Sequence, residues 1–132
     1  MTLKEFFGKD RFAADAGCEI VEASEGHAIV RMTVEERHLN AGGVCQGGAI
    51  FTLADLANAV CTNSHGQLSF SINSNIYIMR SAKVGDVLTA EGVEENHHKL
   101  PFVDVKVRNQ DGELIAIFTG QAYRKNIELP ID

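Results

Sequence analysis

Hydrophobic and polar positions alternate with a period of two over most of this chain. Between residues 18 and 34 the alternation runs along two short segments separated by the turn signal Glu25-Gly26, which predicts a β-hairpin. Four later segments alternate in the same way, at residues 70–79, 87–94, 101–108 and 113–124. Turn signals at residues 83–86 and 109–112 join them, so we expect a strand meander.

One segment breaks this alternation. Residues 48–63 are apolar on nearly every side of a predicted helix, about 24 Å long, and such a helix must be wrapped by other elements. Residues 3–15 mix apolar and charged positions in a loosely helical pattern that could cover an opening. A hairpin, a buried helix and a strand meander together predict an α+β fold, with an antiparallel sheet curled around one helix.

The composition fits one domain and excludes several classes of function. The chain has 132 residues, 45% of them hydrophobic, so we expect a single domain over residues 1–132. Its 12 basic and 18 acidic side chains give a net charge of −6, and no Lys/Arg cluster offsets it, so nucleic acid is not an expected partner. No membrane span or secretory signal is present, which favours a cytoplasmic protein that does not bind membranes.

The cysteines and the paired histidines do not indicate a metal site. Cys18, Cys45 and Cys61 lack C-x-x-C spacing and are expected to be reduced thiols. The adjacent His97 and His98 would point apart on a strand or turn, with no acidic or cysteine partner at ligand spacing. We therefore expect no bound metal, and we interpret this pair as part of a solvated loop.

Candidate chemistry gathers along the apolar helix. The pair Gly47-Gly48 leaves the first backbone N–H groups of the helix bare, which makes a seat for an oxygen that gains negative charge. Asp55 is the one carboxylate within residues 48–63. Burial raises the pKa of such an acid and makes it a stronger base once it ionises.

These residues resemble a known family. The runs His38-Leu39-Asn40, Gln46-Gly47-Gly48 and Leu53-Ala54-Asp55, followed by residues 71–86, are similar to hotdog-fold acyl-CoA thioesterases of the phenylacetic-acid-pathway (PaaI) type. The resemblance covers almost the whole chain. It implies a hotdog fold of five to six antiparallel strands around one long central helix. It also implies hydrolysis of a small aromatic or medium-chain acyl-CoA, with coenzyme A present only as part of the substrate and no other cofactor.

The resemblance also assigns roles to individual residues. It implies that Asn40 orients the water or the substrate carbonyl, and that Ser71 assists near the carboxylate. Gln46 departs from the family pattern, which has a histidine at this position. An amide donates and accepts hydrogen bonds but cannot become charged, so Gln46 is expected to position groups near the carbonyl without shuttling protons.

The spacing of Gly47 and Asp55 predicts that two subunits share each site. Thioester hydrolysis needs an oxyanion donor, here the Gly47 N–H, worth about 3–4 kcal/mol of barrier, and a general base or nucleophile, here Asp55. The two residues lie eight positions apart, about 12 Å along a helix, whereas both must lie within about 3.5 Å of the reacting atoms. If two copies of the helix lie antiparallel across a two-fold axis, Gly47 of one chain faces Asp55 of the other, so we expect a homodimer. The resemblance further implies a tetramer, a dimer of dimers.

Coenzyme A contacts are expected at the Gly48 amide and at the cations Arg80, Lys83 and Lys99, because positive side chains suit phosphate groups. Other functions stay open. The domain could bind acyl-CoA without hydrolysing it. It could hydrate an enoyl thioester through His38, or use Cys45 as a nucleophile with His38 as its base. Asp55 could also be a structural acid that Thr52 or Asn58 satisfies at helical spacing.

Overall fold

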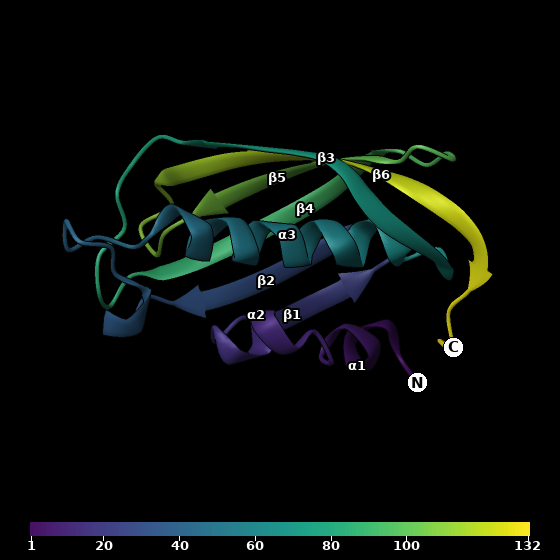
Figure 1. The fold of residues 1–132 in the computed structure, drawn as a ribbon, viewed down its shortest axis with the longest axis horizontal. Coiled ribbons are helices and arrows are strands. Elements are labelled where there is room, and N and C mark those ends of the chain that lie inside the picture. Colours follow the sequence, from purple (N-terminus) through teal and green to yellow (C-terminus); the bar gives the residue numbers. More distant parts are fainter.

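A computed structural model describes residues 1–132 as one long helix lying across one face of a six-stranded antiparallel sheet (Figure 1). The strands are β1 (Glu19–Ser24), β2 (His27–Thr33), β3 (Gln67–Ile78), β4 (Val87–Asn96), β5 (Phe102–Arg108) and β6 (Leu114–Glu128). The helix, α3 (Gly47–Asn63), begins one residue earlier than predicted. The predicted α+β architecture is confirmed.

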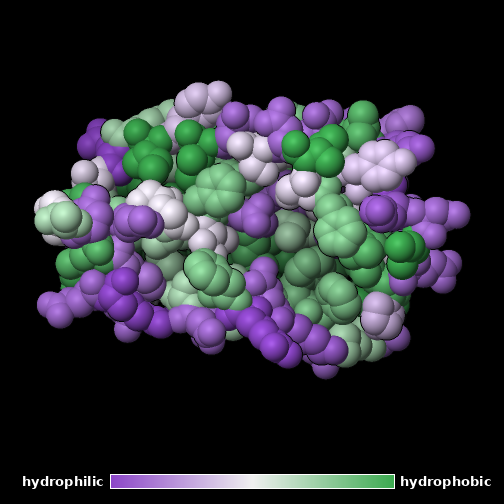
Figure 2. Space-filling view, viewed as in Figure 1, coloured by the Kyte–Doolittle hydropathy of each residue, from purple (hydrophilic) through white to green (hydrophobic).

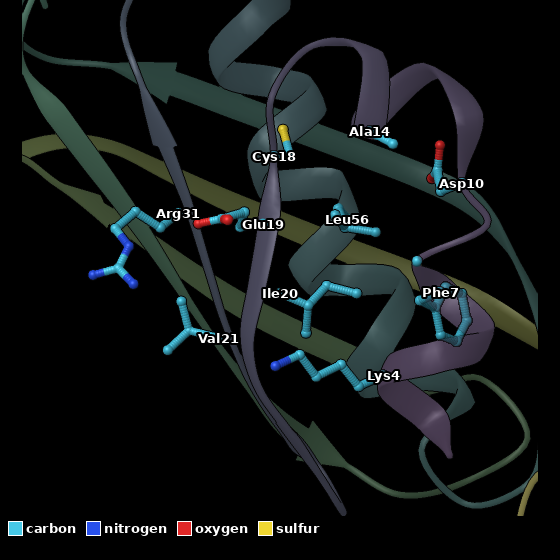
Figure 3. Close-up of a pocket in the computed structure, with 11 residues that line it drawn as sticks. Lys4, Phe7, Asp10, Ala14, Cys18, Glu19, Ile20, Val21, Arg31 and Leu56 are labelled. Carbon is cyan, nitrogen blue, oxygen red and sulfur yellow. The ribbon is translucent and has the colours of Figure 1, made fainter. Parts of the chain in front are cut away.

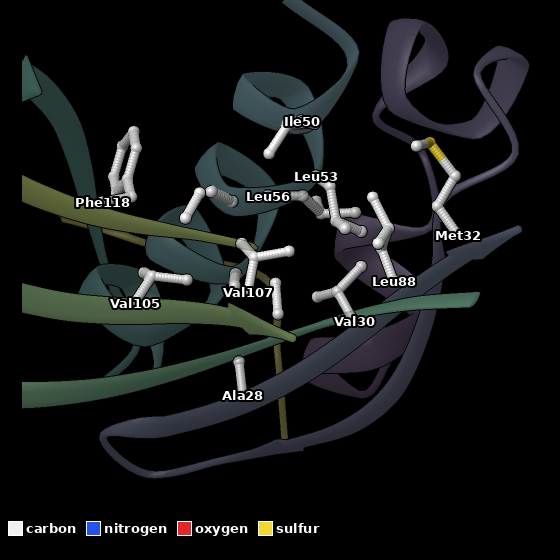
Figure 4. Packing of buried hydrophobic residues seen from close by; sticks show 14 of the residues in the cluster. Ala28, Val30, Met32, Ile50, Leu53, Leu56, Leu88, Val105, Val107 and Phe118 are labelled. Atoms are coloured by element: carbon white, nitrogen blue, oxygen red, sulfur yellow. The ribbon is translucent and has the colours of Figure 1, made fainter. Parts of the chain in front are cut away.

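The face of α3 that meets the sheet forms the centre of the hydrophobic core. Leu53 of the helix is fully buried, as are Val30, Val105 and Phe118 on three strands (Figure 4). These strand residues come from the alternating positions of the sequence, because one face of each strand is directed at the helix. Full burial of a side chain of this size stabilises a fold by about 1.5–3 kcal/mol. No helix combines the length and apolarity needed to cross a bilayer.

The strand order differs from a simple meander. The order is β1-β2-β4-β5-β6-β3, so α3 carries the chain across the sheet and β3 lies at the far edge, beside β6. The turn at residues 83–86 forms as predicted, with the Lys83 N–H donating to Asp86 Oδ2 at 2.9 Å, but it joins two strands that are not neighbours. Turn residues reverse the chain without selecting its partner, and the 12-residue β3 finds a partner of matching length in the 15-residue β6. The outer edge of β3 is left uncovered.

A bulge in β3 controls which of its side chains face the helix. Ile72 stands between two paired residues, Ser71 and Asn73, and has no partner on β6. Because side chains alternate between the two faces of a strand, one extra residue reverses the positions that point at α3. Ser71 faces the helix before the bulge, and Ile76 packs against the core after it. The bulge thus allows Ser71 and Ile76, five positions apart, to lie on the same side of β3.

The first fifteen residues form two short helices, α1 (Leu3–Phe7) and α2 (Arg11–Asp15), where the sequence pattern indicated one loosely helical segment. Each helix has its own N-cap. The Thr2 hydroxyl accepts from the Glu5 N–H at 3.1 Å, and Asp10 Oδ1 accepts from the Ala13 N–H at 3.1 Å. Both helices lie along β1 and the lower flank of α3 in Figure 1. They flank α3 and leave part of its outer face open.

Candidate active site

The start of α3 leaves two backbone donors free. Gln46 is the N-cap residue, but its side chain makes no capping hydrogen bond, and the Gly47 and Gly48 N–H groups have no acceptor in the chain. A Cβ on Gly48 would lie 2.5 Å from Gln46 Oε1, so the Gln46 amide folds over this glycine. A Cβ on Gly47 would lie 3.0 Å from Ile78 Cδ1, so the helix start rests against the end of β3. The bare helix terminus therefore forms as predicted.

Asp55 lies further along the same helix and is only partly exposed. Burial makes the largest contribution to raising its pKa, the negative charge of Asp10 raises the pKa further, and a hydrogen bond with the Asn58 side chain lowers it. Since Asp10 is the N-cap of α2, the N-terminal segment brings its charge to this site. Eight residues of helix separate Asp55 from Gly47, about 12 Å, so the two groups cannot serve one reaction centre within a single chain.

Ser71 lies beside Asn58, a residue that sequence reasoning treats only as a possible partner of Asp55. Asn58 is completely buried one turn beyond Asp55, and its Nδ2 donates to Ser71 Oγ at 3.3 Å. At the sequence level Asn58 was only a residue that could satisfy Asp55 at helical spacing. No pattern indicated that β3 would come to lie next to it, because that contact depends on the order of the strands.

Asn40 is partly occupied by its own loop. Its Oδ1 accepts from the N–H groups of Gly42 at 2.9 Å and Val44 at 3.2 Å, which is the turn-forming bond typical of asparagine. Its Nδ2 makes no hydrogen bond within the chain and is exposed. The role that the resemblance gives to Asn40, orienting water or a carbonyl, therefore stays a prediction for this amide nitrogen.

The contacts of His38 and Cys45 oppose the two alternatives that depend on them. His38 is the last residue of a short 3₁₀ turn, η1 (Glu36–His38), and its Nδ1 accepts from the Glu35 N–H at 2.9 Å. Its Nε2 lies 2.7 Å from the Ala16 carbonyl oxygen, which can only accept, so Nε2 carries the proton. Burial raises the pKa of the Cys45 thiol, which disfavours the thiolate. These contacts favour structural rather than catalytic roles for both side chains.

The three cations predicted to contact coenzyme A lie at two ends of the sheet. Arg80 and Lys83 lie between β3 and β4, whereas Lys99 follows the other end of the ten-residue β4, about 33 Å away. Arg80 Nη1 donates to Glu113 Oε2 at 3.1 Å, and Lys99 Nζ lies 5.4 Å from the centre of the Tyr123 ring. Within one chain the three cations do not form a single phosphate site.

Two pockets flank α3. The first, of about 580 Å³, lies at the start of the helix and is lined by residues that include Phe12, Leu39, Gln46, Gly48 and Thr52. The second, of about 440 Å³, lies between the N-terminal helices, β1 and α3, where Phe7, Ile20 and Leu56 contribute apolar walls (Figure 3). Asp10 lines this second pocket and also acts on the pKa of Asp55, so the pocket lies close to the carboxylate.

A further polar cluster, which sequence reasoning missed, forms at the other end of α3. The potential ligand atoms of His65, Glu94 and His97 lie within 4.8 Å of one another, because the helix end and the end of β4 meet there. Arg124 joins them, with Nη2 3.6 Å from Glu94 Oε2 and Nη1 3.0 Å from His97 Nδ1. The two imidazole rings stack with centroids 3.5 Å apart, which prevents both rings from directing a lone pair at one ion. A guanidinium already neutralises the carboxylate, so we interpret this cluster as a charge network.

Comparisons with known proteins agree with this architecture. The family model of the thioesterase superfamily matches residues 42–116, more than half of the chain. A relative from Archaeoglobus fulgidus is 45% identical over 112 residues, which are 84% of this chain and 73% of that protein. The acyl-coenzyme A thioesterase PaaI of Escherichia coli K12 is 34% identical over 119 residues, 89% of this chain and 85% of its own.

Solved structures extend the agreement to three dimensions. The E. coli PaaI protein from the phenylacetic acid degradation operon matches with a TM-score of 0.90 at 31% identity, covering 94% of this chain and 91% of that one. The Streptococcus mutans protein smu.793, bound to acetyl CoA, matches with a TM-score of 0.82 at 30% identity, covering 86% and 92%. The predicted resemblance is confirmed, and the chain belongs to the thioesterase superfamily as a PaaI-type hotdog thioesterase.

Proposed function

We propose that this protein hydrolyses acyl-CoA thioesters to a free acid and coenzyme A, at two equivalent sites in a homodimer. One observation carries the proposal: a single helix presents bare N–H groups at Gly47 and Gly48 and, two turns further on, a carboxylate of raised pKa at Asp55. The E. coli relative named for acyl-coenzyme A hydrolysis supports the reaction, and the S. mutans structure with acetyl CoA supports the substrate class.

The chemistry follows from these two groups. The Gly47 N–H donates to the thioester carbonyl oxygen as that oxygen becomes an oxyanion. The partner subunit's Asp55 takes a proton from water, the water oxygen bonds to the carbonyl carbon, and the C–S bond then breaks. The proton on the carboxyl group neutralises the leaving thiolate. Direct carboxylate attack through an anhydride, which water then hydrolyses, uses the same groups. No cofactor is required beyond the coenzyme A of the substrate, because the oxyanion donor and the base are both supplied by the protein.

Pairing through β3 would bring the two groups together. The outer edge of β3 carries unpaired backbone groups, and Phe70, Ile72 and Tyr77 along it are 54%, 57% and 59% exposed. A long apolar edge strand invites another strand, here one from a second copy of the chain. Figure 2 shows apolar side chains gathered over the middle of the molecule, on the face where α3 lies in Figure 1. A two-fold axis through paired β3 strands sets two α3 helices antiparallel, which directs Gly47 of one protomer toward Asp55 of its partner.

The substrate can be assigned to the surfaces around this centre. The pocket of about 440 Å³ is lined by Leu56, the residue after Asp55, and its volume suits a small aromatic or medium-chain acyl group. Arg80 and Lys83 lie between β3 and β4, and a two-fold axis reverses the ends of the sheet, so Lys99 of the partner subunit joins them for the phosphates. The Gly48 N–H and the Gln46 side chain are then left to contact the thioester group. Pairing of two such dimers into a tetramer completes the proposed assembly.

Release of free thiol from a panel of acyl-CoA substrates tests the proposal. We expect turnover of aryl-acetyl and medium-chain members by the native protein. Asp55→Asn should lower kcat by about 10²–10⁴-fold, because it removes the base while keeping the size and the hydrogen bonds of the side chain. Asp111→Asn, in an exposed turn, is the matched control and should retain full activity.

The outcomes separate the alternatives. If no member of the panel releases thiol while acyl-CoA binds, the protein is the non-catalytic binding module. If Asp55→Asn hydrolyses at the native rate, the assignment of Asp55 is wrong although the reaction stands.

A further inference from the structure

Asn58 is the most unusual polar residue of α3. Its side chain has 0% exposure in the middle of an apolar helix, and its Oδ1 has no hydrogen-bond partner. An amide transferred out of water without full hydrogen bonding costs about 1–3 kcal/mol, judged by substitutions in other proteins. An alanine or leucine would avoid that cost and still fit the pattern of the helix. The residue therefore requires an explanation other than stability.

The sheet makes room for this amide. A Cβ on Gly120 of β6 would lie 2.5 Å from Asn58 Oδ1, 2.7 Å from its Cγ and 2.9 Å from its Nδ2. These distances are shorter than carbon contacts allow, and the amide lies against the strand, so no other residue fits opposite it. A glycine within a strand weakens the strand, by loss of packing and by added backbone entropy. Asn58 on α3 and Gly120 on β6 are thus each a less stable choice than other residues would be, and the two lie against each other.

The position of Asn58 connects two residues of the proposed site. Asp55 lies one helical turn before it, at the spacing where side chains of a helix meet. Ser71 of β3, which precedes the bulge at Ile72, accepts from Asn58 Nδ2 at 3.3 Å. The charged group that faces Asp55 from another element is Asp10, on α2. Asn58 lies on the same helix as Asp55, and its side chain is neutral and fully buried.

We propose that Asn58 is a positioning residue, which holds the Asp55 carboxylate in its reactive orientation and couples it to Ser71, and that Gly120 exists to seat it. This inference rests on the proposed function. The hydrogen bond from Asn58 favours the ionised carboxylate, because it opposes the effects of burial and of Asp10. A base held ionised in a mostly buried place is what proton abstraction from water requires. Asn58 does this without touching the substrate.

The competing explanation is that Asn58 merely fixes the helix against the sheet. The pair Asn58 and Gly120 allows the two explanations to be separated. Asn58→Ala leaves a cavity where its amide was, and the Cβ introduced by Gly120→Ala lands within 3 Å of the vacated Oδ1, Cγ and Nδ2 positions. The double variant N58A/G120A therefore refills part of the cavity and lacks the donor. Asn58→Leu, which keeps most of the volume, serves as a second variant if the double variant does not fold.

We expect N58A/G120A to fold as a dimer and to lose about tenfold to a hundredfold in kcat, with little change in KM, as for a lost hydrogen bond to a charged group. Removing the donor removes an interaction that lowers the pKa of Asp55, so that pKa should rise. Because the base works when ionised, the acid limb of the pH–rate profile should move to higher pH. Carbon-13 NMR titration of the Asp55 carboxyl group should record the same direction of change without any substrate.

Asn63 supplies the matched control. It is a second buried asparagine on α3, but its Oδ1 accepts from the Ser69 N–H at 2.8 Å and its Nδ2 donates to the Ala59 carbonyl at 2.8 Å, so its two shortest bonds are to backbone. Asn63→Ala should lower stability and leave the acid limb and the Asp55 titration where they are.

If N58A/G120A instead keeps the native pH profile and the native Asp55 titration, Asn58 is a packing residue and the inference is wrong, while Asp55-dependent hydrolysis stands. If the native protein releases no thiol, the proposed function fails and the NMR titration still decides the inference.

Discussion

The pKa of Asp55 depends on groups from two elements, its own helix α3 and the N-cap of α2. Its own helix buries it, the N-cap of α2 adds the negative charge of Asp10, and Asn58 opposes both with a hydrogen bond. Burial and like charge disfavour the carboxylate, whereas a donor favours it. A base of raised pKa is stronger once ionised. If Asp55 is the base, as proposed, the N-terminal segment that lines the adjacent pocket also tunes the strength of that base through Asp10.

Asp10→Asn tests this tuning. Asparagine caps a helix about as well as aspartate, so α2 should persist while the charge disappears. The Asp10 charge raises the pKa of Asp55, so its removal lowers that pKa and keeps the base ionised in more acidic solution. The acid limb of kcat/KM should therefore move to lower pH, with little change in the melting temperature. Asp15→Asn, on the same helix, is the control, and an unmoved acid limb in Asp10→Asn would show that this charge does not reach the site.

Sequence reasoning located the residues whose roles depend on local structure and missed those that depend on packing. Gly47 and Asp55 could be recognised because a helix start and a lone acid in an apolar helix are visible along the chain. The connection between Asn58 and Gly120 joins positions 62 residues apart (120 − 58), and it exists only because β6 passes behind α3. The cluster of His65, Glu94 and His97 escaped prediction for the same reason.

At the scale of elements, periodicity predicted every strand and the long helix, but not their arrangement. The alternating segments end within a few residues of the observed strands, because alternation reports directly which face is buried. The partner of β3 is a non-local choice, so the turn before β4 wrongly suggested adjacency. The bulge at Ile72 carries no glycine or proline signal, yet it changes which positions of β3 face the helix after Ser71.

The close seating of α3 on the sheet predicts the effect of a small change on β4. A Cβ on Gly92 would lie 3.0 Å from Cys61 Sγ and 3.3 Å from the Ala57 carbonyl oxygen. The backbone of a packed helix cannot easily give way, so Gly92→Ala should lower the free energy of unfolding by about 1–3 kcal/mol, as overpacked cores do. Urea denaturation measures this. Gly42→Ala, in an exposed loop with 3.4 Å to its nearest neighbour, Asn40 Oδ1, should change stability by less than about 0.5 kcal/mol, and equal losses in both variants would refute the packing argument.

At the scale of the whole molecule, a single chain contains the proposed catalytic groups but holds them too far apart to act together. It carries the proposed oxyanion donors and the proposed base, yet one helix holds them about 12 Å apart. The same chain leaves β3 uncovered at the sheet edge beside the open face of α3. The proposed two-fold partner would answer both points, because it would pair with the edge strand β3 and would set the second helix in the opposite direction.

Subunit mixing tests whether each site is built from two chains. Gly47→Pro removes the oxyanion donor at the first helical position, where proline is tolerated, and Gln46 already has the extended backbone (φ −66°, ψ 138°) that a following proline needs. The Gly47→Pro homodimer should lose about 10²–10³-fold in kcat, and the Asp55→Asn homodimer should be impaired as well. In a heterodimer of the two variants, purified through two different tags, one shared site regains both native groups and the other loses both. Such a heterodimer should recover about half of the native activity, whereas a site contained within one chain would leave it as inactive as its parents.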